Sequence, residues 1–342
     1  MTGASSVTCP GADLGSPPGA IRSRALRSSG MRVLVTGGAG FIGSHIADAL
    51  LARGDEVLVL DDLSSGRAGR LDPQVPLHKV TITDAAALND EVATFGPELI
   101  CHLAAQIDVR ASVDAPAADA DVNILGTVNL LEAARQAGAR VLFASTGGAL
   151  YGRDAPIPSL EDVLPLPESP YGIAKYCAEC YIGLYNRLHG TRHSVLRLAN
   201  VYGPRQDPSG DAGVIPIFCG CVAVGQEPTI YGDGAQTRDL VYVADAVSVF
   251  LAAADSGRPG IWNAGTGIEV SVLDLVAVIA GIAGHPVTPQ FAPARVGDLL
   301  RSSLAVDRAE RDLGWRADTP LADGVTKVYR WIEAGAPDRA GC

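Results

Sequence analysis

The stretch MRVLVTGGAGFIGSHIADALLA, residues 31–52, carries the strongest structural signal in this chain. A predicted strand at 32–36 runs directly into a glycine-rich turn, and an apolar-periodic helix follows. Gly37 permits a tight turn, Gly40 lets the backbone approach a pyrophosphate, and Gly43 lets the helix pack closely on the strand. The pattern predicts a dinucleotide-binding turn, although the first two glycines are one residue further apart than in the usual fingerprint.

A pair of carboxylates supports this interpretation. Asp61 and Asp62 end the next predicted strand, 18 residues after Gly43. A carboxylate at this place accepts hydrogen bonds from the adenosine ribose and repels a 2′-phosphate. The sequence therefore favours NAD over NADP as the cofactor, and Arg67 nearby keeps NADP as an alternative.

Strand and helix patterns alternate along the rest of the chain, which is typical of a parallel sheet wrapped by helices. The predicted strands are 32–36, 56–60, 77–82, 99–103, 141–145 and 194–198. The predicted helices are 40–52, 85–95, 117–136, 171–189, 272–283 and 321–331. The fold class is therefore α/β, with a Rossmann-like, doubly wound parallel sheet and a smaller C-terminal lobe.

The chain divides into four predicted parts. Residues 31–199 form the NAD-binding domain, and residues 200–335 mainly form a substrate-binding lobe, with a segment at about 240–265 returning to the main domain. Residues 1–30 lack any apolar stripe and are predicted to be a disordered tail, and 336–342 a C-terminal tail. We expect Met31 to be the native start, because it directly precedes the first predicted strand.

Composition excludes several classes of partner. The 342 residues contain 27 Lys and Arg against 38 Asp and Glu, a net charge of −11, which argues against binding a nucleic-acid backbone. No apolar run approaches the ~20 residues of a membrane-spanning helix. The seven cysteines have neither disulfide-framework nor zinc-site spacing, so we expect no metal site and a reducing, cytoplasmic location.

Tyr171 and Lys175 form the candidate catalytic pair. They are four residues apart at the start of a predicted helix, so both side chains project from one face. A phenol with a pKa near 10 is a poor base at neutral pH, and we expect Lys175 and a nicotinamide ring to lower that pKa. Ser145 and Thr146 end the preceding predicted strand, and either hydroxyl can hydrogen-bond the reacting group.

Further motifs follow in a fixed order: HLAAQ at 102–106, NVYGPR at 200–205, GDGAQTRD at 232–239 and RVGD at 295–298. With them, the chain resembles the UDP-glucose 4-epimerase family of the extended short-chain dehydrogenase/reductases, from Met31 to about Glu333. The resemblance implies bound NAD and a UDP-sugar substrate. Tyr171 would take the proton of the sugar 4-hydroxyl while hydride leaves C4, the keto sugar would rotate, and hydride would return to its other face. Lys175 would hold the cofactor ribose.

The resemblance and the glycine turn together give a set of candidate binding residues. Those for the cofactor are Gly37, Gly40, Phe41, Ile42, Gly43, Asp61, Asp62, Ser64, Ser65, Gly66, Ile82, Leu103, Ala104, Ala105, Gln106, Asn123, Tyr171 and Lys175. Those for the nucleotide sugar are Thr146, Tyr171, Asn200, Arg238, Arg295 and Asp298. Arginines suit a diphosphate, because their planar fork binds two oxygens at once.

Three positions depart from the family pattern. Gly147 stands where many epimerases have the catalytic serine, so Ser145 or Thr146 must supply the hydroxyl. Residues 80–82 lack the acid that usually contacts adenine. Ser302 replaces a bulky tyrosine, which predicts room for the N-acetyl group of UDP-N-acetylglucosamine and UDP-N-acetylgalactosamine.

Several other functions compete with the epimerase interpretation. Sugar-nucleotide dehydratases and decarboxylases need an acid or base near 147–149, where this chain has Gly-Gly-Ala. A UDP-glucuronate 4-epimerase stays open, and a non-catalytic NAD-binding regulator is the alternative from a different class. The helices 117–136 and 171–189 have wide apolar faces, and the resemblance implies that they form a homodimer interface.

Overall fold

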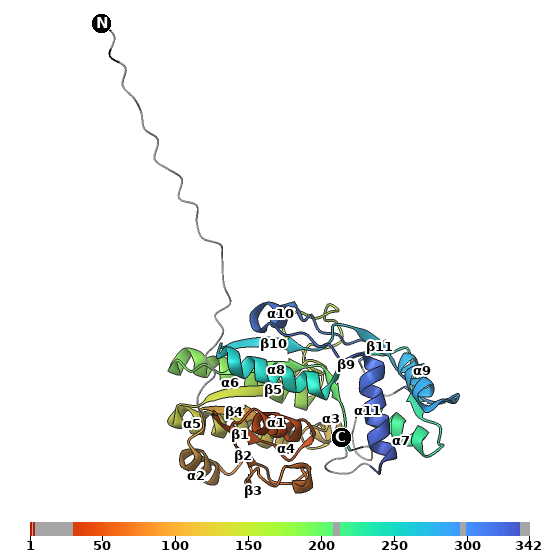
Figure 1. Cartoon of the computed structure of the whole chain (residues 1–342), viewed down its shortest axis with the longest axis horizontal. Helices are drawn as coiled ribbons and strands as arrows, with labels where there is room; N and C mark the ends of the chain where they lie inside the picture. Colours follow the sequence, from red (N-terminus) through yellow and green to blue (C-terminus); the bar gives the residue numbers. More distant parts are fainter. Residues whose placement is uncertain (2, 4–29, 208–212, 295–298, 336–342) are drawn as a thin grey trace.

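Seven parallel strands form the central sheet of the computed structural model, which describes residues 1, 3, 30–207, 213–294 and 299–335 (Figure 1). Their order is β10-β6-β5-β4-β1-β2-β3. The strands are β1 (Arg32–Thr36), β2 (Glu56–Leu60), β3 (Leu77–His78), β4 (Leu99–His102), β5 (Arg140–Thr146), β6 (Ser194–Leu198) and β10 (Gly260–Ala264). The order reverses between β1 and β4, which is the place where open α/β sheets bind their ligands.

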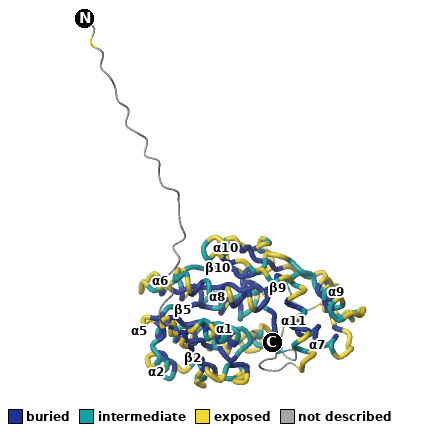
Figure 2. Tube along the Cα trace, in the orientation of Figure 1, coloured by how far each residue is buried: buried dark blue, intermediate teal, exposed yellow. Residues whose placement is uncertain are grey.

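Helices cover both faces of this sheet, so the central strands are buried (Figure 2). One face carries α1 (Phe41–Ala52), α8 (Val243–Ser256) and α10 (Asp307–Leu313), and the other carries α2 (Ala85–Phe95), α5 (Thr127–Ala137) and α6 (Pro170–His189). The alternation along β1 explains the two cores, because Val33 and Val35 lie in the first and Leu34 in the second.

A smaller group of elements lies beyond the carboxyl ends of the strands, on the right of Figure 1. It contains β7 (Asn200–Tyr202), α7 (Val214–Ala223), β8 (Thr229–Tyr231), β9 (Thr237–Tyr242), β11 (Glu269–Ser271), α9 (Val272–Ala283), β12 (Gln290–Ala292) and α11 (Leu321–Glu333). Helices α7, α9 and α11 share an apolar core that includes Ile215, Leu275 and Val325. The exact division into domains stays a prediction, while β10 pairs with β6 in the main sheet.

Two predicted boundaries are wrong. The strand at 77–82 ends at His78, because the chain turns at Thr81, whose carbonyl accepts the Asp84 amide, and Asp84 then caps α2. The helix at 117–136 is divided into α4 (Pro116–Ala120), a π-helical segment η2 (Asp121–Gly126) and α5. The other predicted strands of the sheet agree within one residue.

The remaining short elements are α3 (Val109–Asp114) and η1 (Ala68–Arg70). In the described part of the chain, no helix is long and apolar enough to cross a membrane. The predicted tails, 1–30 and 336–342, lie almost wholly outside the described residues.

Candidate active site

The glycine-rich turn lies at the carboxyl end of β1 and is closed to side chains. Gly37 has a φ of +69°, and a Cβ on it would lie 2.5 Å from the Ala104 nitrogen. A Cβ on Gly43 would lie 2.2 Å from the Gly37 oxygen, so α1 can approach the turn only with glycine there. The first amides of α1, at Phe41 and Ile42, have no partner within the helix. This cradle fits a dinucleotide diphosphate.

Asp61 and Asp62 have different environments. Asp61 is buried, and its two oxygens accept the Ala39 amide at 2.9 Å and the Leu63 amide at 2.8 Å. Burial raises the pKa of Asp61, and these two hydrogen bonds oppose the rise. Asp62 is exposed, and its Oδ1 accepts the Ser64 amide and hydroxyl. Asp61 is therefore the carboxylate beside the glycine turn that can receive ribose hydroxyls.

Asn123 holds the loop that follows β4. It lies in η2, where its Oδ1 accepts the Gln106 amide at 3.0 Å and its Nδ2 donates to the Gln106 carbonyl at 2.9 Å. Single π-helical turns are common at functional sites, and here the turn places a buried amide against the predicted cofactor loop. The loop between β4 and α3 contains Leu103, Ala104 and Ala105.

Tyr171 and Lys175 lie in the first two turns of α6. The helix begins sharply because Ser169 accepts the Gly172 amide at 3.1 Å and Pro170 occupies the first helical position. The Thr146 side chain, at the end of β5, lies close enough to the Tyr171 hydroxyl to lower the pKa of that phenol, in opposition to burial. Burial raises the pKa of Tyr171 to about 12, and the lowering expected from Lys175 together with a nicotinamide ring stays a prediction.

Lys175 is buried between α6 and the sheet. Its Nζ donates to the Ala144 carbonyl at 3.1 Å and lies 4.7 Å from the Phe143 ring centroid. Its distance to the Tyr171 ring centroid is 6.0 Å, and burial lowers its own pKa to about 8. The Lys175 ammonium is directed to the Ala144 carbonyl, and burial therefore has the largest effect on the pKa of Tyr171.

The two candidate hydroxyls at the end of β5 lie in different surroundings. Thr146 meets Tyr171, whereas Ser145 is buried and donates to Glu179 Oε1 at 2.5 Å. Glu179 in turn pairs with Arg197 at 2.6 Å, and both side chains are almost completely buried. The Ser145 hydroxyl therefore belongs to an interior network.

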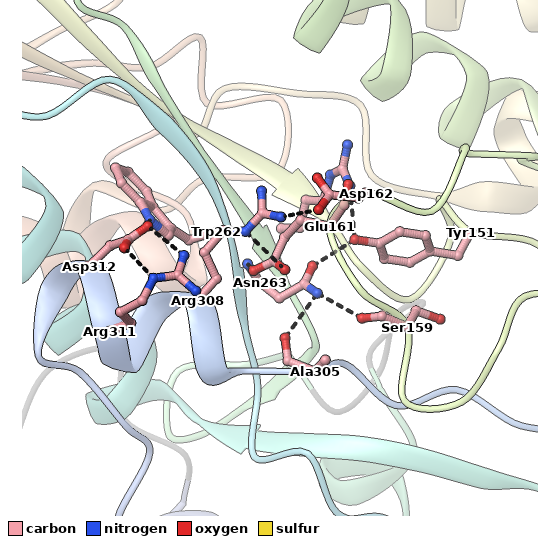
Figure 3. A network of polar contacts seen from close by, with 11 residues as sticks. Tyr151, Ser159, Glu161, Asp162, Trp262, Asn263, Ala305, Arg308, Arg311 and Asp312 are labelled. Carbon is pink, nitrogen blue, oxygen red and sulfur yellow. Dashed lines mark hydrogen bonds and ion pairs between the residues drawn. The ribbon is translucent and has the colours of Figure 1, made fainter.

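That network continues to β10, as Figure 3 shows in part. Arg197 Nη1 donates to the Tyr151 hydroxyl at 2.8 Å, and Tyr151 donates to Asn263 Oδ1 at 2.8 Å. Asn263 Nδ2 donates to the carbonyls of Ser159 and Ala305 (Figure 3). Sequence analysis missed this network, although a charged residue inside the apolar strand β6 was a signal for it.

The candidate substrate residues lie on separate elements. Asn200 begins β7, and a Cβ on Gly148 would lie 3.3 Å from its Oδ1. Arg238 is on β9, where its Nη1 donates to the carbonyls of Thr237 and Leu299. Arg295 and Asp298 lie outside the described residues.

The other predicted cofactor residues lie at or near the carboxyl edge of the central sheet. Gly40 is the N-cap of α1, and a Cβ on Gly66 would lie 2.6 Å from Asp61 Oδ1. Ser65 precedes Gly66 in the loop after β2. Ile82 is buried, and a Cβ on Gly126 would lie 2.7 Å from it. Within the described ranges, no group of three or more His, Cys, Asp or Glu is arranged to hold a metal ion.

The sheet and its polar edge place the chain among NAD-binding enzymes with a Rossmann-like fold. Comparison with known proteins defines the family more closely. Residues 33–265 match the NAD dependent epimerase/dehydratase family, and the chain belongs to that family. The predicted Rossmann-like fold, membership of an NAD-dependent enzyme family and NAD as the cofactor are thereby confirmed.

Three relatives are similar over nearly the whole chain. The UDP-glucose 4-epimerase of Mycolicibacterium smegmatis is 48% identical over 309 residues, covering 88% of this chain and 98% of that protein. The UDP-glucose 4-epimerase structure from Thermotoga maritima with UDP-glucose has a TM-score of 0.88 and 41% identity, covering 89% of this chain and 99% of that one. The Thermus thermophilus UDP-glucose 4-epimerase complex with NAD has a TM-score of 0.82 and 42% identity, covering 88% and 98%.

Proposed function

We propose that this chain interconverts UDP-glucose and UDP-galactose by inverting the sugar at C4, with NAD as its bound cofactor. The similarity to three UDP-glucose 4-epimerases supports the substrate class. The observation that carries the proposal is the position of Tyr171 and Lys175 in the first two turns of α6, with Thr146 beside the phenol at the carboxyl end of β5, on the edge of the sheet that also carries the glycine turn.

The chemistry follows from the roles that these side chains can take. When bound, NAD supplies a positively charged nicotinamide ring that accepts hydride from the sugar and favours the phenolate form of a nearby phenol. Tyr171 takes the proton of the 4-hydroxyl and later returns it. Thr146 orients the same oxygen through its own hydroxyl. Lys175 binds the cofactor ribose and contributes positive charge to the site.

A dehydratase or decarboxylase is less well supported by the same edge of the sheet. Either reaction needs a further proton donor or acceptor after Thr146. Residues 147–149 are Gly-Gly-Ala, and a Cβ on Gly147 would lie 2.4 Å from Leu304 Cδ1. A larger titratable side chain at this position would displace Leu304, so the site favours epimerisation.

The test is a panel of UDP-, GDP- and dTDP-sugars, including UDP-glucuronate, with products identified by NMR. We expect UDP-glucose and UDP-galactose to interconvert. Tyr171→Phe should lower kcat by roughly 100-fold or more, because a proton-transfer group contributes about that much. Tyr181→Phe, on the exposed side of the same helix, is the matched control and should keep full activity. Bound NAD without turnover of any sugar would refute the proposal and favour a regulatory protein.

The nucleotide-sugar contacts are also proposals. Asn200, Arg238, Arg295 and Asp298 are assigned to the UDP-sugar. Ser302 is buried and small, which supports acceptance of an N-acetyl group at C2 of the sugar. Turnover of UDP-N-acetylgalactosamine beside UDP-galactose measures this, and complete rejection of the N-acetyl sugar would contradict it.

We further propose a homodimer in which α6 pairs with its copy. Ile173, Tyr181, Leu184 and Leu188 are exposed and follow one another at three, four or eight residues along this helix. Such a second apolar stripe is costly in water. Leu184→Glu should give a single-protomer mass in light scattering, whereas Leu164→Glu, exposed elsewhere, should not.

A cytoplasmic location is proposed because the described cysteines are all free thiols.

A further inference from the structure

Asp119 is a buried carboxylate near the candidate catalytic pair that the mechanism above does not use. It lies on α4, which packs against α6, and only 2% of the residue is exposed. Its Oδ1 accepts hydrogen bonds from Gln106 Nε2 at 3.0 Å and from Asn123 Nδ2 at 2.9 Å. Burial raises the pKa of Asp119, while the two amide donors and the charge of Lys175 oppose that rise, and the amides also fix the orientation of the carboxylate.

The other oxygen of Asp119 is buried and has no hydrogen-bond partner among the described residues. The Lys175 ammonium also has fewer hydrogen-bond partners than it can bind. It has three donors, and within the described part of the chain it makes one hydrogen bond, to the Ala144 carbonyl. A buried ammonium is expensive unless an opposite charge lies near it, and the same holds for a buried carboxylate. The charge of Asp119 opposes the effect of burial on the pKa of Lys175, and the charge of Lys175 does the same for Asp119.

We propose that Asp119 is a positioning residue whose carboxylate keeps Lys175 in the ammonium form inside the protein. This inference rests on the proposed epimerase, because the ammonium form is the one that can hold the ribose and favour the phenolate of Tyr171.

Among the other titratable groups around the pair, Glu179 also raises the pKa of Lys175, but it has a smaller effect than Asp119. Glu179, one turn further along α6, is already paired with Arg197 at 2.6 Å. His102 on β4 is neutral, because burial lowers its pKa to about 3. Burial lowers the pKa of Lys175 to about 8, and Asp119 opposes that change.

The sign of the expected effect is the same for both catalytic groups. The negative charge of Asp119 raises the pKa of Lys175 and also that of Tyr171. Removing the charge lowers both pKa values. The whole pH profile of kcat should therefore move to lower pH, since one limb reports the phenolate and the other the ammonium.

The chain makes a direct measurement possible, because it contains three lysines, Lys79, Lys175 and Lys327. Labelling with ¹³Cε-lysine gives one NMR signal for each, and Lys79 and Lys327 are exposed reference residues. We expect Asp119→Asn to move the Lys175 titration to lower pH by roughly one pH unit, since loss of a nearby opposite charge changes a pKa by about that much. Asp121→Asn, which removes an exposed charge two residues away, should leave it unchanged.

The kinetic measurement uses the NAD-loaded protein and the same variants. Asp119→Asn should shift both limbs of the kcat profile to lower pH, whereas a merely structural residue would lower kcat without moving the limbs. Asp119→Glu should restore the Lys175 titration towards that of the unaltered protein. Where Asp119→Asn does not fold, Asp119→Ser removes the same charge without adding bulk.

An unchanged Lys175 titration in a folded, charge-free variant overturns the proposal. The titration needs no turnover, so this result is independent of the proposed function. Failure of the unaltered protein to interconvert any UDP-sugar would instead refute the epimerase and leave the titration result standing.

Discussion

Replacing Glu179 with leucine tests the buried ion pair behind β5. Glu179 receives Arg197 Nε at 3.1 Å and Nη2 at 2.6 Å, and it also accepts the Ser145 hydroxyl at 2.5 Å. The side chains of the pair are 3% and 2% exposed. A guanidinium cannot lose its proton, so Glu179→Leu leaves a buried, unpaired charge.

Breaking such a pair costs about 3–5 kcal/mol of the free energy of unfolding. At about 2 °C per kcal/mol for a chain of this size, Tm should fall by roughly 6–10 °C. Urea unfolding followed by circular dichroism measures the loss, with the NAD concentration held constant because bound ligand adds to apparent stability. The control is Glu310→Gln in the exposed pair with Arg316, which should cost about 0–1 kcal/mol.

The double variant Glu179→Leu/Arg197→Met separates charge from packing. Two apolar side chains can replace a buried ion pair at little cost, so the double variant should recover about 2 kcal/mol or more of the loss. The reasoning is refuted if Glu179→Leu costs less than about 1 kcal/mol, or if the double variant is no more stable than the single one.

Three further predictions concern the turn, the core and the site. Gly43→Ala places a methyl group 2.2 Å from a backbone oxygen and should cost about 1–3 kcal/mol and weaken NAD binding in calorimetry, whereas Gly281→Ala, with open space around it, should not. Burial lowers the pKa of His193 to about 4, so between pH 6.5 and 4 the unfolded chain binds this proton and the folded chain does not, and the free energy of unfolding decreases as the pH is lowered. His193→Gln should reduce the slope of the free energy of unfolding against pH by up to about 1.4 kcal/mol per pH unit, and an unchanged slope would contradict this. Thr146→Val should lower kcat by roughly 10- to 100-fold, the value of a hydrogen bond to a charged group, and a larger loss in Ser145→Ala would refute the assignment of the catalytic hydroxyl.

The parts of the site that could be predicted are those encoded by short spacings. Gly37 and Gly43 were identifiable because a strand, a turn and a helix follow one another within a few residues. Tyr171 and Lys175 were identifiable because residues four apart share a helix face. Asp61 followed from the end of the next strand.

The predictions that failed or stayed open depend on contacts between distant segments. The strand at 77–82 was overestimated because β3 lies at the edge of the described sheet, paired with β2, and Ile82, beyond the end of β3, is buried against Gly126 of η2 instead. The choice between Ser145 and Thr146 depended on a contact that only folding creates, the hydrogen bond that Ser145 donates to Glu179, 34 residues further along the chain.

The order of residues alone established the parallel α/β architecture, the dinucleotide turn and the tyrosine–lysine pair, because each is written in a repeat of two or about four residues. Folding in three dimensions decided which hydroxyl lies beside the phenol, which buried carboxylate lies near Lys175 and which charges are buried together. Those outcomes depend on desolvation and on neighbours brought from other strands and helices, and electrostatic energies are set by such surroundings and not by distance along the chain.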